Sequence, residues 1–263
     1  MTEVPLLRPS WAAPAGVGAA MSLRGAEGDC GGRSSGPYAS LNLGVAVGDD
    51  AAVVAANRAR FSAAIGAHPV WLRQVHGTRV RQLGAAGKAV DSVDAGPADA
   101  AWTRERGVAC TVQVADCLPV LYAMRDGSAV AAAHAGWRGL AGGVLEAALA
   151  VLCRGSGGVA ADVVVWLGPC IGKSRFEVGV DVRAAFGADA DGESDACFVP
   201  RPRADGSVRW LADLQGLAHR RLAAAGVRSI SVDASCTYEQ QSRFFSFRRN
   251  AVTGRMAAAV WLR

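Results

Sequence analysis

Seven short apolar runs recur along the 263-residue chain, and these runs constrain its fold more than any other feature. Each is six or seven residues long, and most are dominated by Val, Leu and Ala, which is typical of strands buried within a sheet. In chain order they read VWLRQV, VACTVQV, LPVLYAM, SAVAAAH, DVVVWLG, RSISVD and MAAAVWL. A chain with this many strands must bury them in extended sheets.

Three segments between the runs have the signals of helices. Residues 49–66 begin with two Asp residues and end with Gly, a second helix is expected near Leu140, and a third over residues 210–226 also ends with Gly. Apolar residues recur at helical spacing in the first two. The side chains expected to face the core are Val54, Phe61, Ile65, Leu140, Val144, Leu145, Ala148, Leu149 and Leu152.

Strands and helices mixed at irregular intervals predict an α/β (α+β) sandwich of mixed β-sheets with flanking helices. The strict alternation of a doubly wound fold is absent. Because no internal repeat or long linker interrupts the sequence, we expect one domain over residues 1–263. Within this domain, residues 1–20 are expected to be extended, and the Gly- and Ser-rich residues 25–37 are expected to form a flexible loop.

Composition narrows the class of protein. Hydrophobic residues make up 51% and charged residues 19%, which indicates a well-buried globular chain. The net charge of +5 comes from scattered Arg residues, a pattern that suits small anions better than nucleic acid. The seven cysteines include no Cys-x-x-Cys pair, and no signal peptide or apolar run of membrane-spanning length is recognisable. We therefore expect a cytoplasmic protein that binds neither membranes nor nucleic acid.

Each of three expected strand ends carries a chemically active side chain. His76 and His134 end strand-like runs and are followed closely by Gly, and Cys117 closes VQVADC. A His–His–Cys set suits Zn²⁺, with the fourth tetrahedral position left for water or substrate. The same side chains could form a trigonal copper site, or a Cys nucleophile with a His base. The neighbouring Asp116 lies between two apolar strands, so its carboxylate needs a partner.

The stretch AAHAGWRGLAGG, residues 132–143, sets His134 and Arg138 among very small residues, directly before the second expected helix. Free backbone N–H groups at a helix start and an Arg fork together favour an anion. The alternative is an ordinary solvated surface Arg. Neither GxGxxG nor a P-loop occurs, so nucleotide phosphates are not held by those devices.

Six segments, spread over nearly the whole chain, carry a family resemblance. They read GPYASLNLG, VWLRQVHG, VQVADCLPVLYA, AAHAGWRGLAGGVLEAAL, WLGPCIGKSRFEVG and CTYEQQSRFFSFRRNAVTGR. In this order they resemble the YfiH-like family, also called the laccase-domain or purine nucleoside phosphorylase family. Two departures stand out: an insertion follows Arg24 in SLRGAEGDCGGRSSG, and Phe176 and Phe247 stand where Tyr is common.

The resemblance implies a single-domain sandwich related to cysteine-hydrolase-like folds. It also implies a zinc site, with copper as the alternative metal, whose ligands are His76, Cys117 and His134. Family members phosphorolyse adenosine, inosine, guanosine and S-methyl-5′-thioadenosine, and deaminate adenosine. Purine nucleosides and phosphate are therefore the expected partners, and a homodimer is compatible with the family.

For these reactions the candidate residues outside the metal site are Asp116 for proton transfer and Arg24, Arg138 and Arg248 for phosphate. Three other functions stay open. One is a single-copper polyphenol oxidase, although a multicopper enzyme needs more imidazoles than four His residues provide. The second is a Cys/His-dependent hydrolase, and the third is a binding factor in peptidoglycan editing.

Overall fold

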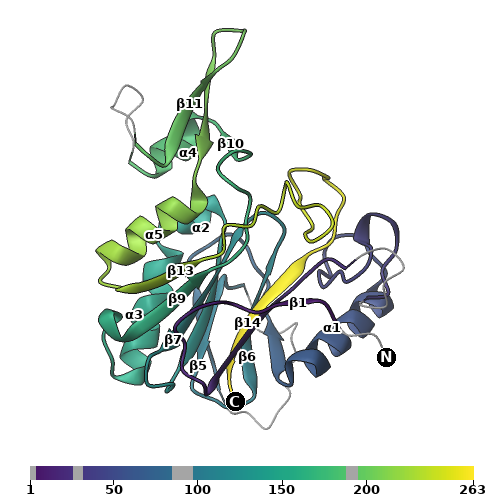
Figure 1. The fold of residues 1–263 in the computed structure, drawn as a ribbon, viewed down its shortest axis with the longest axis vertical. Helices are drawn as coiled ribbons and strands as arrows, with labels where there is room; N and C mark the ends of the chain where they lie inside the picture. Colours follow the sequence, from purple (N-terminus) through teal and green to yellow (C-terminus); the bar gives the residue numbers. More distant parts are fainter. Residues whose placement is uncertain (1–3, 26–31, 85–96, 188–194) are drawn as a thin grey trace.

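Two β-sheets packed face to face form the centre of the computed structural model, which describes residues 4–25, 32–84, 97–187 and 195–263 (Figure 1). The first sheet has the order β1-β2-β14-β6-β3. Its strands are β1 (Leu6–Leu7), β2 (Val17–Ser22), β14 (Met256–Leu262), β6 (Val108–Val114) and β3 (His68–Trp71). The second sheet has the order β13-β9-β7-β8-β5-β4. Its strands are β13 (Ser229–Val232), β9 (Val163–Leu167), β7 (Leu118–Met124), β8 (Val130–Ala135), β5 (Ala100–Thr103) and β4 (Val80–Leu83).

Helices cover the outer face of each sheet, which completes a four-layer sandwich (Figure 1). Helix α1 (Ala51–Ile65) packs on the first sheet. Helices α2 (Trp137–Gly142), α3 (Val144–Ser156) and α5 (Leu214–Ala224) pack on the second. A third, small sheet projects from this body beside α4 (Val180–Ala185). Its strands are β10 (Glu177–Val178), β12 (Val208–Ala212) and β11 (Phe198–Pro202), and two short 3-10 helices span Gly36–Tyr38 and Ala160–Asp162.

Strand β7 shows why the central runs are apolar at every position. Its residues alternate between two cores: Leu121 packs between the two sheets, whereas Val120 and Tyr122 pack under the helices. Successive side chains of a strand point to opposite faces, so a strand covered on both faces is continuously hydrophobic. This arrangement confirms the predicted sandwich of mixed sheets with flanking helices.

The first predicted helix is confirmed together with its caps. The Asp50 carboxylate accepts hydrogen bonds from the backbone N–H groups of Ala52 and Val53, which have no partner within the helix. Gly66 ends the helix with a φ of 65°, the left-handed conformation that favours glycine. The runs VACTVQV, LPVLYAM and MAAAVWL coincide with β6, β7 and β14.

Three predicted boundaries were wrong. The run VWLRQV leaves its sheet after Trp71, because Arg73 pairs with Pro97 outside the named strands. The helix expected near Leu140 is two helices, α2 and α3, since Gly143 between them has a φ of 96°. The third helix starts at Leu214, because Asp213 caps it by accepting from the N–H of Gly216, and the preceding residues belong to β12.

Two segments carried their own predictions: residues 1–20 and the Gly- and Ser-rich residues 25–37. The described part of the N-terminal segment supplies β1 and the start of β2 to the first sheet, and it reverses direction between these two antiparallel strands. In the expected loop 25–37, residues 26–31 lie outside the described residues, and the 3-10 helix Gly36–Tyr38 takes up its end. Among the described residues, no helix has the length and apolar character needed to cross a bilayer.

We expect the change Leu121→Ala to lower the free energy of unfolding by about 2–5 kcal/mol, because it opens a cavity between the two sheets. Urea denaturation followed by circular dichroism measures the effect. The matched control Val45→Ala alters an exposed side chain and should change stability by no more than about 0.5 kcal/mol. Equal effects for the two variants would contradict the sheet-on-sheet core.

Candidate metal centre

Three of the predicted site residues meet at one end of the sandwich. His76 lies in the loop between β3 and β4, Cys117 lies in the turn between β6 and β7, and His134 lies on β8. One ligand atom from each lies within 4.8 Å of the other two. The Cys117 Sγ is 3.8 Å from the His76 Nε2, and the two imidazole rings meet edge to face with centroids 4.8 Å apart.

A fourth residue, Asp99, holds two of these side chains in place, and we did not predict it. Its Oδ1 lies 2.9 Å from the His134 Nδ1 and accepts from the N–H of His76, also at 2.9 Å. Its Oδ2 accepts from the N–H groups of Val75 and Gly77 at 3.1 and 2.8 Å. Asp99 is fully buried, so one carboxylate fixes both a His ring and the loop that carries the other His.

The contact with Asp99 decides which nitrogen of His134 faces the cluster. With Nδ1 bound to the carboxylate, Nε2 is the free ligand atom, an arrangement common for metal-ligating imidazoles. Burial favours the neutral imidazole, but the negative charges of Cys117 and Asp99 outweigh it and raise the pKa of His134 to about 9. The pKa of the Asp99 carboxyl is lowered, since its hydrogen bonds from His134 and the loop amides outweigh its burial.

The same charges act on Cys117. Burial alone would raise the pKa of its thiol, but the two His residues lower that pKa to about 6. At neutral pH the metal-free cluster therefore holds a thiolate next to an imidazolium. A thiolate is both the form that binds metal and the form that attacks as a nucleophile.

Unusual backbone at the strand ends aims the side chains. His76 has a φ of 58° and Asp116 has a φ of 102°, values that non-glycine residues rarely adopt. Such conformations persist only where their surroundings fix them, and they cluster at functional sites. At His76 the fixing contacts are the amides held by Asp99.

The small residues around His134 leave room for the other ligands. A Cβ on Gly136 would lie 2.6 Å from the His76 Cδ2 and 3.0 Å from the Cys117 Sγ. A Cβ on Gly139 would lie 2.9 Å from the backbone oxygen of Gly77. Glycine at both positions is therefore required for the three ligands to converge.

Asp116 lies next to the cluster, but both of its carboxylate oxygens are already used. Oδ1 accepts from the Thr237 hydroxyl at 2.7 Å, and Oδ2 accepts from the N–H of Arg248 at 2.6 Å. Its backbone oxygen accepts from the N–H of Ile171 at 2.9 Å. These contacts tie two distant loops to the turn that carries Cys117, which favours a positioning role for Asp116.

The three Arg residues predicted to bind phosphate differ in the contacts that their guanidinium groups already make within the protein. The Arg24 Nε donates to the backbone oxygen of Ala39 at 2.7 Å, and its guanidinium lies over the Phe245 ring. Arg138 is exposed and lies 4.2 Å from the centroid of the Trp137 ring. Arg248 is exposed, and one of its nitrogens donates to the backbone oxygen of Glu177.

Arg255 is a further cation that interacts electrostatically with the cluster. Burial lowers the pKa of its guanidinium, while the negative charges of Cys117 and Asp116 act in the opposite direction. The guanidinium donates to the backbone oxygens of Thr253 and Gly254 and lies 5.7 Å from the centroid of the exposed Phe247 ring. The Arg255 guanidinium therefore interacts favourably with the negative charges of Cys117 and Asp116.

The two remaining His residues and the Phe residues that stand where Tyr is common do not belong to the metal-binding cluster. His68 and His219 are exposed on β3 and α5. Cys170 is buried, and burial raises the pKa of its thiol. Phe176 is buried beneath the Arg248 guanidinium.

The cluster fits a single metal ion. Ligand atoms at tetrahedral zinc lie about 3.3–3.6 Å apart, given bond lengths of about 2.0–2.3 Å, and the observed 3.8 Å between Sγ and Nε2 is close to this spacing. His76 is exposed, so the remaining position faces solvent. Within the described residues, no other group of three or more His, Cys, Asp or Glu side chains is arranged to hold a metal.

Comparison with known protein families shows to which family the chain belongs. The family model described as a multi-copper polyphenol oxidoreductase laccase matches residues 26–263. The chain belongs to this family. The YfiH-like resemblance seen in the sequence is thereby confirmed, since the same chain matches a YfiH protein over nearly its full length.

Curated relatives of this family cover the whole chain. A Pseudomonas aeruginosa protein named purine nucleoside phosphorylase is 45% identical over 97% of this chain and 98% of its own length. The Escherichia coli purine nucleoside phosphorylase YfiH is 44% identical, with 98% of each chain covered. Among solved structures, a Neisseria meningitidis protein has a TM-score of 0.84 at 39% identity, and YlmD from Geobacillus stearothermophilus has 0.84 at 29%. Each covers at least 98% of both chains.

We expect Gly136→Ala to lower metal affinity by about tenfold or more, because the added methyl would displace the side chains of His76 and Cys117. Competition with a chromophoric chelator measures the affinity. Gly16→Ala, where the added methyl meets nothing within 4 Å, is the matched control and should bind metal normally. Wild-type affinity in Gly136→Ala would show that the three side chains do not share one ion.

We expect Asp99→Asn to weaken metal binding by about 10–100-fold, because the His134 ring loses its charged partner and the loop amides lose one acceptor. The same chelator competition tests this. The exposed Asp126→Asn is the control. Unchanged affinity in Asp99→Asn would mean that the ligands are held without this carboxylate.

Proposed function

We propose that this chain is a metal-dependent purine nucleoside phosphorylase. It converts adenosine, inosine, guanosine and S-methyl-5′-thioadenosine to the free base and a ribose or methylthioribose 1-phosphate. The observation that carries the proposal is the His76–Cys117–His134 cluster, built on Asp99, in a chain 37–45% identical to full-length relatives named purine nucleoside phosphorylase. We further propose Zn²⁺ as the ion, since two imidazoles and one thiolate suit it and leave one position open.

In phosphorolysis, a phosphate oxygen bonds to the ribose C1′ while the bond from C1′ to the purine nitrogen breaks. The purine leaves with the electron pair of that bond and takes up a proton. When bound, the ion would supply Lewis acidity to an oxygen or nitrogen of the substrate. The guanidinium groups of Arg248 and Arg255 are the cations we assign to phosphate, with Arg24 and Arg138 as outer contributors.

Adenosine deamination is the second reaction that we assign to this site. Water adds at the purine C6, and the amino group takes up a proton and leaves as ammonia, which gives inosine. With its Nε2 on the metal and its Nδ1 on the Asp99 carboxylate, His134 has no free nitrogen for proton exchange with a bound substrate. Asp116 remains the candidate proton carrier, although its carboxylate is occupied by Thr237 and Arg248.

A thiol hydrolase is the competing function, and one observation favours it. The lowered pKa of Cys117 and the raised pKa of His134 describe an activated thiolate with an imidazolium partner.

The copper oxidase alternative is weaker, because only two of the four His residues of the chain reach the cluster. The six cysteines that the structure describes are free thiols, which supports a cytoplasmic location.

Incubation of zinc-loaded protein with adenosine, with and without phosphate, separates these functions. We expect adenine and ribose 1-phosphate only when phosphate is present, inosine in both mixtures, and loss of both activities in Cys117→Ala and after chelation. The exposed-site variant Asp126→Asn should retain both activities. Chromatography of the products measures the outcome.

Full turnover in Cys117→Ala would reject the site. A protein that turns over no nucleoside but hydrolyses amides or thioesters only when metal-free would support the thiol hydrolase instead, because a nucleophilic thiolate must be unligated. A metal-bound protein without any turnover would support a binding role.

A further inference from the structure

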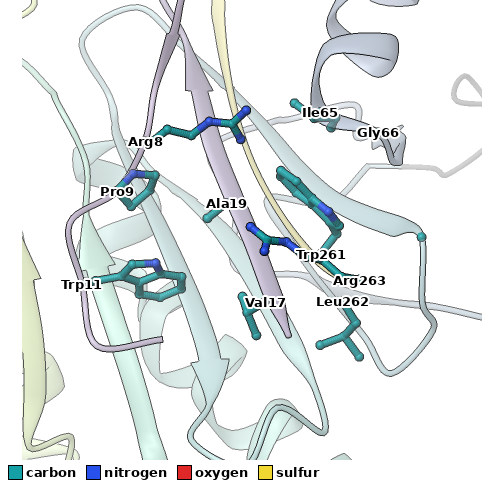
Figure 2. Close-up of a pocket in the computed structure, with 11 residues that line it drawn as sticks. Arg8, Pro9, Trp11, Val17, Ala19, Ile65, Gly66, Trp261, Leu262 and Arg263 are labelled. Atoms are coloured by element: carbon teal, nitrogen blue, oxygen red, sulfur yellow. The ribbon is translucent and has the colours of Figure 1, made fainter. Parts of the chain in front are cut away.

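A hollow lies at the opposite end of the first sheet from the metal centre. It has a volume of about 650 Å³, within the range of small-ligand pockets. The segment between β1 and β2, the end of α1 and the end of β14 surround it (Figure 2). Met256 at the start of β14 pairs with Val114 near the metal centre, whereas Trp261 pairs with Ala109. Five residues of strand, about 17 Å, therefore separate the two regions along β14.

The polar groups of this hollow are cationic. Arg8 and Arg263 both line it, and no Asp or Glu side chain does so within the described part of the chain. Arg8 is exposed, and its guanidinium has no hydrogen bond or ion pair to any described residue. Arg263 donates from Nη1 to the backbone oxygen of Ala15 at 3.3 Å, which anchors the side chain and leaves other N–H groups available. Two guanidinium groups facing one cavity, with no acidic side chain among the residues that line it, favour a doubly charged anion.

Aromatic surface lies next to the two cations. Figure 2 shows the guanidinium groups of Arg8 and Arg263 at either side of Ala19 on β2, with the Trp261 indole beside them and Trp11 across the hollow. Trp261 is buried against β2, where a Cβ on Gly18 would come within 2.2 Å of its ring. Trp11 is only half-buried, so part of its indole remains available to a planar ring.

We propose that this hollow binds a nucleoside monophosphate, with the phosphate between Arg8 and Arg263 and the base against Trp11. The charge selects a phosphomonoester, and the indole selects a planar ring attached to it. The hollow is separate from the metal centre, so the proposal does not depend on the reaction catalysed there. A ligand here would contact β2 and β14, and β14 continues to the metal end of the sheet.

Isothermal titration calorimetry with adenosine 5′-monophosphate tests the proposal on the full chain. We expect binding that weakens by about tenfold or more in the double variant Arg8→Gln/Arg263→Gln, because both charged partners of the phosphate are lost. Binding should also weaken in Trp11→Ala. Arg125→Gln, which removes an exposed Arg elsewhere, should leave the affinity unchanged. Circular dichroism and urea unfolding establish that each variant is folded.

Two comparisons make the result decisive. Inorganic phosphate and adenosine should each bind this hollow more weakly than the monophosphate, so the double variant should change the adenosine affinity by less than about twofold. Cys117→Ala should bind the monophosphate as the wild type does. Unchanged monophosphate affinity in the double variant, no binding at all, or loss of binding in Cys117→Ala would each overturn the proposal.

Discussion

The Asp99 carboxylate is the constraint on which the metal centre depends. It is buried, it orients His134 through Nδ1, and it accepts three amide hydrogen bonds from the loop that carries His76. The backbone oxygen of Asp99 also accepts from the N–H of His134 at 2.7 Å. One residue therefore couples β8 to the loop after β3, and it stabilises the left-handed conformation of His76 that points the ring at Cys117. A buried carboxylate without these partners would be strongly unfavourable, so the loop and the ring are held together as one unit.

Side chains of minimal size complete the arrangement. A methyl group on Gly136 would collide with the His76 and Cys117 side chains, and one on Gly139 would collide with the backbone of Gly77, next to His76. The small residues around His134 are thus a packing requirement of the ligand set. The exposed Arg138 lies against Trp137 at the edge of this region, and we assign it an outer role toward phosphate.

Much of this structure was predictable from local patterns, and the rest was not. Apolar runs and Asp and Gly caps located the central strands and α1, because those signals act within a few residues. The three ligands were predictable because each closes a strand-like run in the sequence and lies within two residues of Gly or Pro. Asp99 was not, since it lies 23 and 35 residues from its partners His76 and His134 in a short Ala-rich segment. A lone Asp between a Pro-containing turn and a buried strand is the only signal that could have pointed to it. Likewise, the contacts of Asp116 join residues more than a hundred positions apart.

The central claim is that His76, Cys117 and His134 bind one ion together. X-ray absorption spectroscopy of the protein loaded with one equivalent of zinc tests it most directly, because it counts sulfur and nitrogen ligands separately. The account predicts one sulfur at about 2.3 Å and two or three lighter ligands at about 2.0–2.1 Å, with the sulfur lost in Cys117→Ala. A zinc environment without sulfur, or one that is unaltered in Cys117→Ala, would contradict it.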